Sequence, residues 1–142
     1  MDKIRIPPFP RHSGYIDWRK AFRISVVAAC WDKKSAIQYV DLYLMESKVS
    51  MADLVDKVPA TMQSMDCKIY QSIMEQCVGN GEDVTRIRKR IEQEGTEFSG
   101  IIALRIIDED YQLNSTRVHH MWHDKLISLR LALIHIRLLN NI

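Results

Sequence analysis

Apolar residues recur every three or four positions along most of the chain, which is the spacing of one face of an α-helix. The pattern predicts helices over residues 15–30, 32–44, 50–58, 61–78, 82–94, 98–111 and 115–140. The sequence therefore predicts an all-α fold, a compact multi-helix bundle whose apolar faces pack against one another.

Turn and cap residues mark the ends of several of these segments. Asp32 is predicted to be the N-cap of the second helix, because its side chain can accept hydrogen bonds from the first amide groups. The glycines within residues 79–81 are predicted to end the fourth helix, and Gly95 to end the fifth. Thr96 and Ser115 are predicted to cap the two segments that follow.

The N-terminus opens on a proline-rich stretch, "IPPFP", before the first helix. Proline fixes φ and lacks an amide hydrogen, so this stretch is predicted to be an extended arm over residues 1–14. Ile6 and Phe9 on the arm need a surface to cover them, and Trp18 and Phe22 offer one on the first helix. We expect the arm to fold over that face or to be exchanged with a neighbouring copy.

The last segment carries more apolar positions than one packing face requires. One set follows a heptad-like spacing: Val118, Trp122, Leu126, Leu129, Leu133 and Ile136. A second set forms a stripe on another face: Leu131, Ile134 and Leu138. The expected organisation is an arm (1–14), a helical domain (15–114) and a long C-terminal helix (115–142), which is an interface helix or the start of a second lobe. One interpretation makes this helix the centre of the core, and the other makes it a self-association surface.

Composition narrows the function only slightly. The net charge of +2 does not indicate a nucleic-acid-binding protein by itself. A basic cluster could still contact phosphates, although nearby carboxylates weaken its field: Arg86, Arg88, Lys89 and Arg90. Three scattered cysteines predict buried thiols in a reducing compartment, hence a cytoplasmic protein, and no run is apolar enough to span a bilayer.

Candidate chemistry is sparse. His119 and His123 are four residues apart on a predicted helix, as two zinc ligands can be, but no third ligand accompanies them. The carboxylates of "DEDY" (108–111) are predicted to be solvated at a helix end. No G-x-S-x-G elbow or activated cysteine is present. We therefore predict no enzyme, no catalytic residue, no metal and no cofactor.

The order of several short patterns resembles the Gag polyprotein of copia-type LTR retrotransposons. At the N-terminus the matching positions are Ile6, Pro7, Phe9, Gly14, Tyr15, Trp18 and Phe22. Further along, "DCKIYQSIMEQCV", "ALRIIDEDYQLNS" and "WHDKLISLRL" resemble that family's later helices. Two features depart from it: "GIIAL" lacks the family's usual Trp, and residues 31–59 are closer to the gypsy-type Gag pattern.

The resemblance implies an all-helical capsid protein that assembles with copies of itself into a virus-like particle in the cytoplasm. It predicts self-association through Ile6, Phe9, Trp18, Phe22, Leu131, Ile134 and Leu138. The family's RNA-binding zinc knuckle has no counterpart here, so any RNA contact is expected to be weak and made by the basic patches. The alternatives are a helical adaptor or nucleic-acid-binding module that uses those patches, and a small metal-dependent enzyme that uses His119 and His123.

Overall fold

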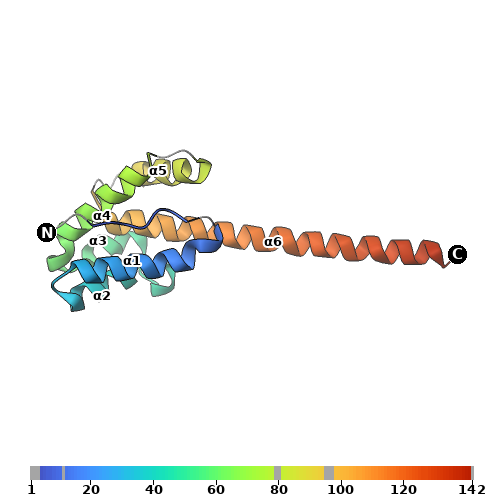
Figure 1. Cartoon of the computed structure of the whole chain (residues 1–142), viewed down its shortest axis with the longest axis horizontal. Helices are drawn as coiled ribbons and strands as arrows, with labels where there is room; N and C mark the ends of the chain where they lie inside the picture. The colour runs from blue at the N-terminus through green and yellow to red at the C-terminus, as the bar shows by residue number, and fades with distance from the viewer. Residues whose placement is uncertain (1–3, 11, 79–80, 95–97, 142) are drawn as a thin grey trace. The chain divides into compact units, whose positions relative to one another are not determined.

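A computed structural model describes residues 4–10, 12–78, 81–94 and 98–141, without the side chains of His12 and residues 114–122. Within this part of the chain all regular structure is helical, which confirms the predicted all-α class. Figure 1 shows the order of the elements: α1 (Tyr15–Ala29), α2 (Lys33–Leu42), α3 (Met51–Lys57), α4 (Gln63–Gln76), α5 (Glu82–Glu94) and α6 (Gly100–Asn140). Single 3-10 turns cover His12–Gly14, Met45–Ser47 and Ala60–Met62.

The chain divides into two compact units, Met1–Tyr111 (unit 1) and Gln112–Ile142 (unit 2). The division falls inside α6, so that residues 100–111 of this helix belong to unit 1. The sequence predicted two helices here, separated by a cap at Ser115. In the structure Ser115 lies within the continuous helix α6, so it is not a cap.

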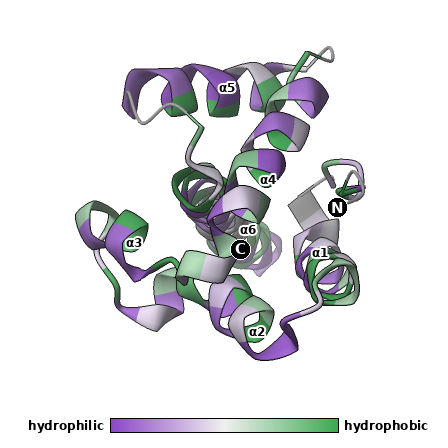
Figure 2. Ribbon diagram, turned by 90° about the vertical axis from the view of Figure 1, so that its left-hand side faces the viewer, coloured by the Kyte–Doolittle hydropathy of each residue, from purple (hydrophilic) through white to green (hydrophobic). Residues whose placement is uncertain are grey.

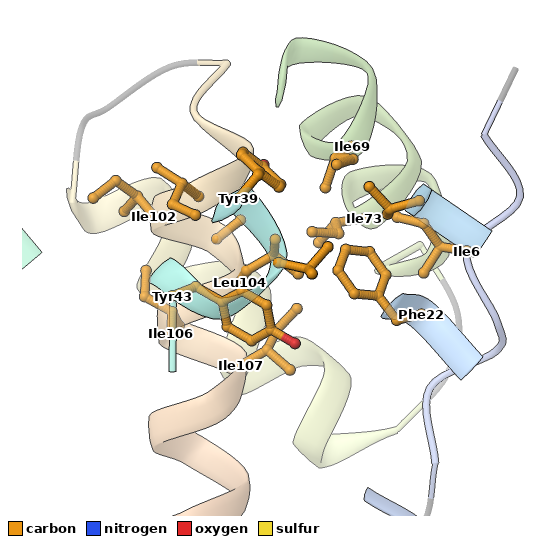
Figure 3. Packing of buried hydrophobic residues seen from close by; sticks show 14 of the residues in the cluster. Ile6, Phe22, Tyr39, Tyr43, Ile69, Ile73, Ile102, Leu104, Ile106 and Ile107 are labelled. Carbon is orange, nitrogen blue, oxygen red and sulfur yellow. The ribbon is translucent and has the colours of Figure 1, made fainter. Parts of the chain in front are cut away.

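The centre of unit 1 is the first part of α6. Its apolar side chains are at most 4% exposed: Ile101, Ile102, Ala103, Leu104, Ile106 and Ile107. Figure 2 shows α1 to α5 grouped around this helix, and Figure 3 shows the side chains that pack on it, with Phe22, Tyr39 and Ile73 among them. A helix that is covered on all sides can be apolar all round, which explains why apolar residues occupy most positions from 101 to 107.

The junction between α1 and α2 is held by charged side chains. Lys33 donates from Nζ to the carbonyl oxygens of Val27 at 2.8 Å and Cys30 at 2.6 Å, which satisfies the C-terminal end of α1. Asp32 is the N-cap of α2, as predicted, and accepts a hydrogen bond from the Ser35 amide at 3.3 Å. Hydrogen bonds from Ser35 lower the pKa of Asp32.

The proline-rich segment packs into unit 1. Residues 4–10 form no helix, and Ile4 and Ile6 are buried in the core cluster. Trp18 donates from Nε1 to the Pro7 carbonyl at 2.9 Å, and Gln76 donates from Nε2 to the Ile6 carbonyl at 2.7 Å. The segment therefore lies against Trp18 of its own chain, which is one of the two arrangements that the sequence predicted for the arm.

The observed ends of α1 to α4 lie within two residues of the predicted helix ends. The range of α5, Glu82–Glu94, is the predicted one. Gly79, Gly95 and Thr96, predicted to end or cap helices, lie outside the described residues. The cysteines are free, and Cys67 is exposed whereas Cys30 and Cys77 are buried as predicted.

Candidate functional site

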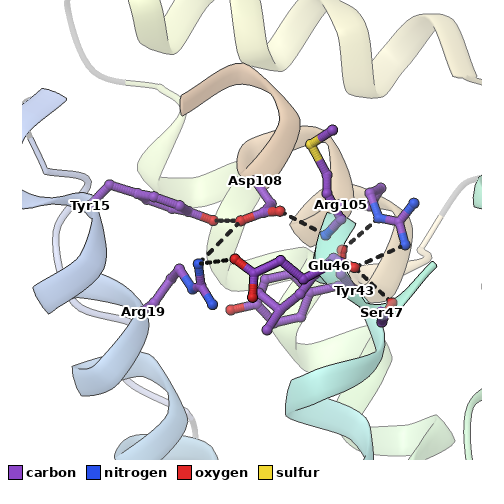
Figure 4. A network of polar contacts seen from close by, with 9 residues as sticks. Tyr15, Arg19, Tyr43, Glu46, Ser47, Arg105 and Asp108 are labelled. Atoms are coloured by element: carbon purple, nitrogen blue, oxygen red, sulfur yellow. Dashed lines mark hydrogen bonds and ion pairs between the residues drawn. The ribbon is translucent and has the colours of Figure 1, made fainter. Parts of the chain in front are cut away.

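A buried carboxylate joins α1, α6 and the loop after α2 (Figure 4). Asp108 on α6 is 0% exposed and accepts a hydrogen bond from the Tyr15 hydroxyl. The amide of Met45 donates to Oδ2 of Asp108 at 2.9 Å. Arg19 Nη1 lies 4.0 Å from Oδ1, the oxygen that accepts from Tyr15. Burial and the neighbouring carboxylate raise the pKa of Tyr15 far above its usual value, so the hydroxyl remains a donor.

Asp108 was predicted to be solvated at a helix end, and the structure corrects this. Its helix continues past Asp108, and donors that lie far away in the sequence cover both carboxylate oxygens. Asp110 in the same string is only 9% exposed. Buried carboxylates are tolerated when they are paired and hydrogen-bonded, and Asp108 meets that condition.

A buried arginine on the same helix orders the loop between α2 and α3. Arg105 is 5% exposed. It donates to the carbonyl oxygens of Tyr43 and Val49 at 2.6 Å each, and to that of Leu44 at 3.3 Å. Tyr43 is the C-cap of α2, and Leu44 and Val49 lie in the loop between α2 and α3. Arg105 therefore binds the loop to the central helix.

A second buried carboxylate caps the start of α6. Asp66 on α4 accepts hydrogen bonds from the amides of Gly100 at 3.1 Å and Ile101 at 2.7 Å, and from the Tyr39 hydroxyl. The site is an N-cap whose side chain comes from another helix. Burial raises the pKa of Asp66, although these hydrogen bonds act in the opposite direction.

The chemistry of these groups is structural. Among the described residues, Gln76 Oε1 is the sole buried side-chain oxygen or nitrogen without a hydrogen-bond partner. The carboxylates of Asp66 and Asp108 are thus already occupied by donors of the same unit. Their arrangement fixes α6 in unit 1 and offers no open acid or base to a substrate.

The basic cluster on α5 is largely occupied by acceptors of unit 1. Arg86 makes a two-pronged ion pair with Asp110, with both hydrogen bonds at 2.8 Å, and Arg90 pairs with Glu109. Arg88 donates to the Cys77 carbonyl, while Lys89 is exposed. A phosphate would have to compete with the α6 carboxylates for Arg86 and Arg90, so the pairs favour a role in holding α5 on α6.

The aromatic residues predicted to mediate self-association lie inside unit 1. Trp18 stacks on Phe22 with ring centroids 5.4 Å apart, and Phe9 lies 6.0 Å from Trp18. Ile6, Trp18 and Phe22 are buried, and Phe9 is half-buried. Since side chains of the same chain cover them, this N-terminal part of the predicted association surface belongs to the core instead.

The predicted histidine pair cannot be assembled from the described side chains. His123 is exposed, and the side chain of His119 lies outside the described residues. Among the side chains that the structure does describe, no three of His, Cys, Asp or Glu come together as a metal site.

An apolar groove of about 660 Å³ lies beside α4, near Phe98. Phe98 is 62% exposed, has a φ of 63°, and meets Tyr70 edge-on with ring centroids 5.8 Å apart. Met74 and Val78 complete the apolar lining. Trp31, in the turn after α1, is another large exposed side chain, at 87%.

The largest set of exposed apolar side chains is in unit 2. Each leucine and isoleucine of residues 123–140 is at least 45% exposed: Leu126, Ile127, Leu129, Leu131, Leu133, Ile134, Ile136, Leu138 and Leu139. The three C-terminal residues predicted for self-association are 63%, 53% and 63% exposed in the order Leu131, Ile134 and Leu138. We call residues 123–140 the exposed segment of α6.

Sequence reasoning missed Asp66, Arg105 and Asp108, which hold the central helix. A charged residue within a long apolar run was the available signal for Arg105, since a charge in such a run must find partners. Asp108 gave no such signal, because Glu109 and Asp110 follow it directly. Asp66 gave no such signal, because its place near the start of α4 also fits a helix-dipole role.

Comparisons of the chain with protein-family models, curated proteins and solved structures find no match in any of the three. No helix in the described part of the chain combines the length and the apolar character needed to cross a membrane.

Proposed function

We propose that the protein is a structural, self-assembling protein of the Gag capsid type, in which the exposed segment of α6 binds other copies of the chain. Unit 1 acts as the helical body of the subunit. Many copies joined through their exposed segments form an oligomer or shell, which in the Gag interpretation is a virus-like particle in the cytoplasm.

One observation carries the proposal: the nine leucines and isoleucines of the exposed segment all remain at least 45% exposed. Isolated exposed apolar residues are common on proteins, but a contiguous set of this size indicates an interaction surface.

A second copy is the occupant that the surface favours. The exposed segment has apolar residues at heptad spacing, and helices with that spacing pack on one another by inserting side chains between those of the facing helix. The same surface on two copies is then self-complementary, as a symmetric interface requires. Residues 123–140 contain one carboxylate, Asp124, so they do not show the alternating charges of a surface-exposed single helix.

The test is the mass of the protein in solution, measured by light scattering over a concentration series, with negative-stain microscopy of the heaviest fraction. We expect mass to rise with concentration. The double variant Ile134→Glu/Leu138→Glu is expected to have a lower mass than the wild type at each concentration, with unchanged helicity by circular dichroism, because both side chains are exposed.

Ile24→Glu is the matched control. Ile24 is 69% exposed but lies on α1 in unit 1, so its mass profile should equal that of the wild type. A wild-type protein that stays monomeric at every concentration would contradict the proposal. A loss of assembly in Ile24→Glu but not in the double variant would move the association surface to unit 1.

A further inference from the structure

We infer that the exposed segment of α6 binds two copies of itself at once, one on each of two opposite sides, so that its assemblies extend beyond dimers. The inference rests on the proposed self-association and adds its stoichiometry. It concerns two sets of residues. The Leu126 stripe is Leu126, Leu129, Leu133 and Ile136, and the Ile127 stripe is Ile127, Leu131, Ile134 and Leu138.

The two stripes face different directions. Each follows the three-and-four spacing of a coiled-coil seam, and every member is at least 45% exposed. At 3.6 residues per turn, the mean directions of the stripes differ by roughly 150° around the helix axis. One partner helix contacts only one such seam, so a simple two-stranded coil would leave the other stripe in water.

Other residues lie between the stripes. Arg130 and Arg137 lie on the shorter arc, and Ser128 and His135 lie on the longer arc together with Ala132 and Leu139. In a helix packed between two neighbours, these residues remain at the two faces that stay in contact with water. Exposed arginines can keep their charged groups in water while their stems cover apolar surface.

The residue types within the stripes also favour more than two helices. In its own register the Ile127 stripe has leucine at the two a positions, Leu131 and Leu138, and isoleucine at the two d positions, Ile127 and Ile134. Leucine at a with isoleucine at d shifts parallel coiled coils from dimers toward larger assemblies.

The apolar surface of one stripe is small for a stable pair. Four side chains that are each about half exposed offer a fraction of the roughly 800 Å² per partner that a standard interface buries. Use of both stripes doubles the apolar surface that each copy covers. Repeated weak contacts can then hold an assembly that a single contact would not.

The experiment removes each stripe separately. Leu129→Gln/Leu133→Gln weakens the Leu126 stripe, and Leu131→Gln/Leu138→Gln weakens the Ile127 stripe. Glutamine keeps a good helix propensity and adds no charge. The matched control is Ser128→Gln/His135→Gln, which places the same two glutamines on the longer arc, outside both stripes.

Mass is measured by light scattering and analytical ultracentrifugation, with circular dichroism as the check of folding. We expect wild-type mass to exceed that of a dimer, and each stripe variant to stop at dimers or smaller species. The concentration at which half of the copies are assembled should rise roughly 10- to 100-fold in either stripe variant. The control should assemble as the wild type does, and the variant with both stripes changed should be monomeric.

Three other outcomes separate the inference from the proposal beneath it. If one stripe variant assembles as the wild type does while the other is monomeric, the two-sided inference is overturned and self-association stands. If the wild type is monomeric throughout, the proposed function itself fails. A wild-type protein that never exceeds a dimer overturns the two-sided inference alone.

Discussion

Residues 100–111 and 123–140 belong to the same helix and are rich in the same residue types, yet their surroundings are opposite. Leu104 is 0% exposed and Leu133 is 64% exposed. The first stretch also carries Arg105 and Asp108, whose hydrogen bonds join it to the loop after α2 and to α1. Apolar composition alone therefore does not decide whether a helix is buried, because burial also requires neighbours that supply matching contacts.

The largest expected effect separates two leucines of this one helix. Leu104→Ala should lower the free energy of unfolding by about 2–5 kcal/mol, because it leaves a cavity in a filled core. Leu133→Ala should change it by less than about 0.5 kcal/mol, because the side chain is already in water. Urea unfolding, followed by circular dichroism at concentrations where the protein is monomeric, measures both. Equal losses would show that residues 123–140 are covered within the monomer.

A smaller effect is expected where the central helix meets α4. A Cβ added at Gly100 would lie well inside van der Waals distance of the Asp66 carbonyl oxygen and 3.1 Å from the Tyr70 amide nitrogen. Both atoms are backbone and cannot move independently, so Gly100→Ala should cost about 1–3 kcal/mol of unfolding free energy. The shift in urea midpoint measures this cost.

Gly14→Ala is the comparison for Gly100→Ala. Its added Cβ would meet only a side-chain atom, Pro10 Cβ, at 3.3 Å. The expected loss is therefore smaller than at Gly100. A loss at Gly100 no larger than at Gly14 would mean that α4 and α6 can separate without cost.

The smallest effect concerns the pH dependence of the cap on α6. The raised pKa of Asp66 means that the folded state holds this proton more tightly than the unfolded state does. Stability should therefore be highest below the unfolded pKa, and should fall as pH rises through the raised folded pKa. Asp66→Asn cannot ionise, so this part of the pH profile should be absent from the variant.

Thermal or urea unfolding of wild type and Asp66→Asn across the acidic range, at constant ionic strength, compares the two slopes. Asp56→Asn, at a carboxylate that is exposed on α3, is the matched control for the substitution itself. A profile for Asp66→Asn that parallels the wild type would show that another group accounts for the dependence.

Local rules predicted much of unit 1 because local signals were strong there. The range of α5 follows from a polar segment with Val84, Ile87 and Ile91 at helical spacing. Asp32 was identifiable as a cap because its side chain bonds to a residue three positions on. The apolar face of α1 was also correct, as Trp18 and Phe22 are buried.

The remaining features depend on contacts between distant residues. Tyr15 and Asp108 are 93 positions apart, and no local pattern distinguishes this buried carboxylate from a solvated one. The aromatic face of α1 was recognisable from spacing, but spacing does not say whether the same chain or another copy covers it. For the exposed segment of α6 the sequence left both a core and an interface interpretation open. Its side chains are not buried within unit 2, and the interface interpretation is the one that we propose.

The exposed segment of α6 also bears on the lifetime of a subunit in the cell. Uncovered leucine and isoleucine side chains are the feature by which chaperones and proteases select incompletely assembled chains, and abundance depends on how long that feature is displayed. If other copies cover the segment, as we propose, assembly and survival are linked. A copy that finds neighbours is protected, and a copy made in small amounts is removed, which sets a threshold of synthesis below which no assemblies accumulate.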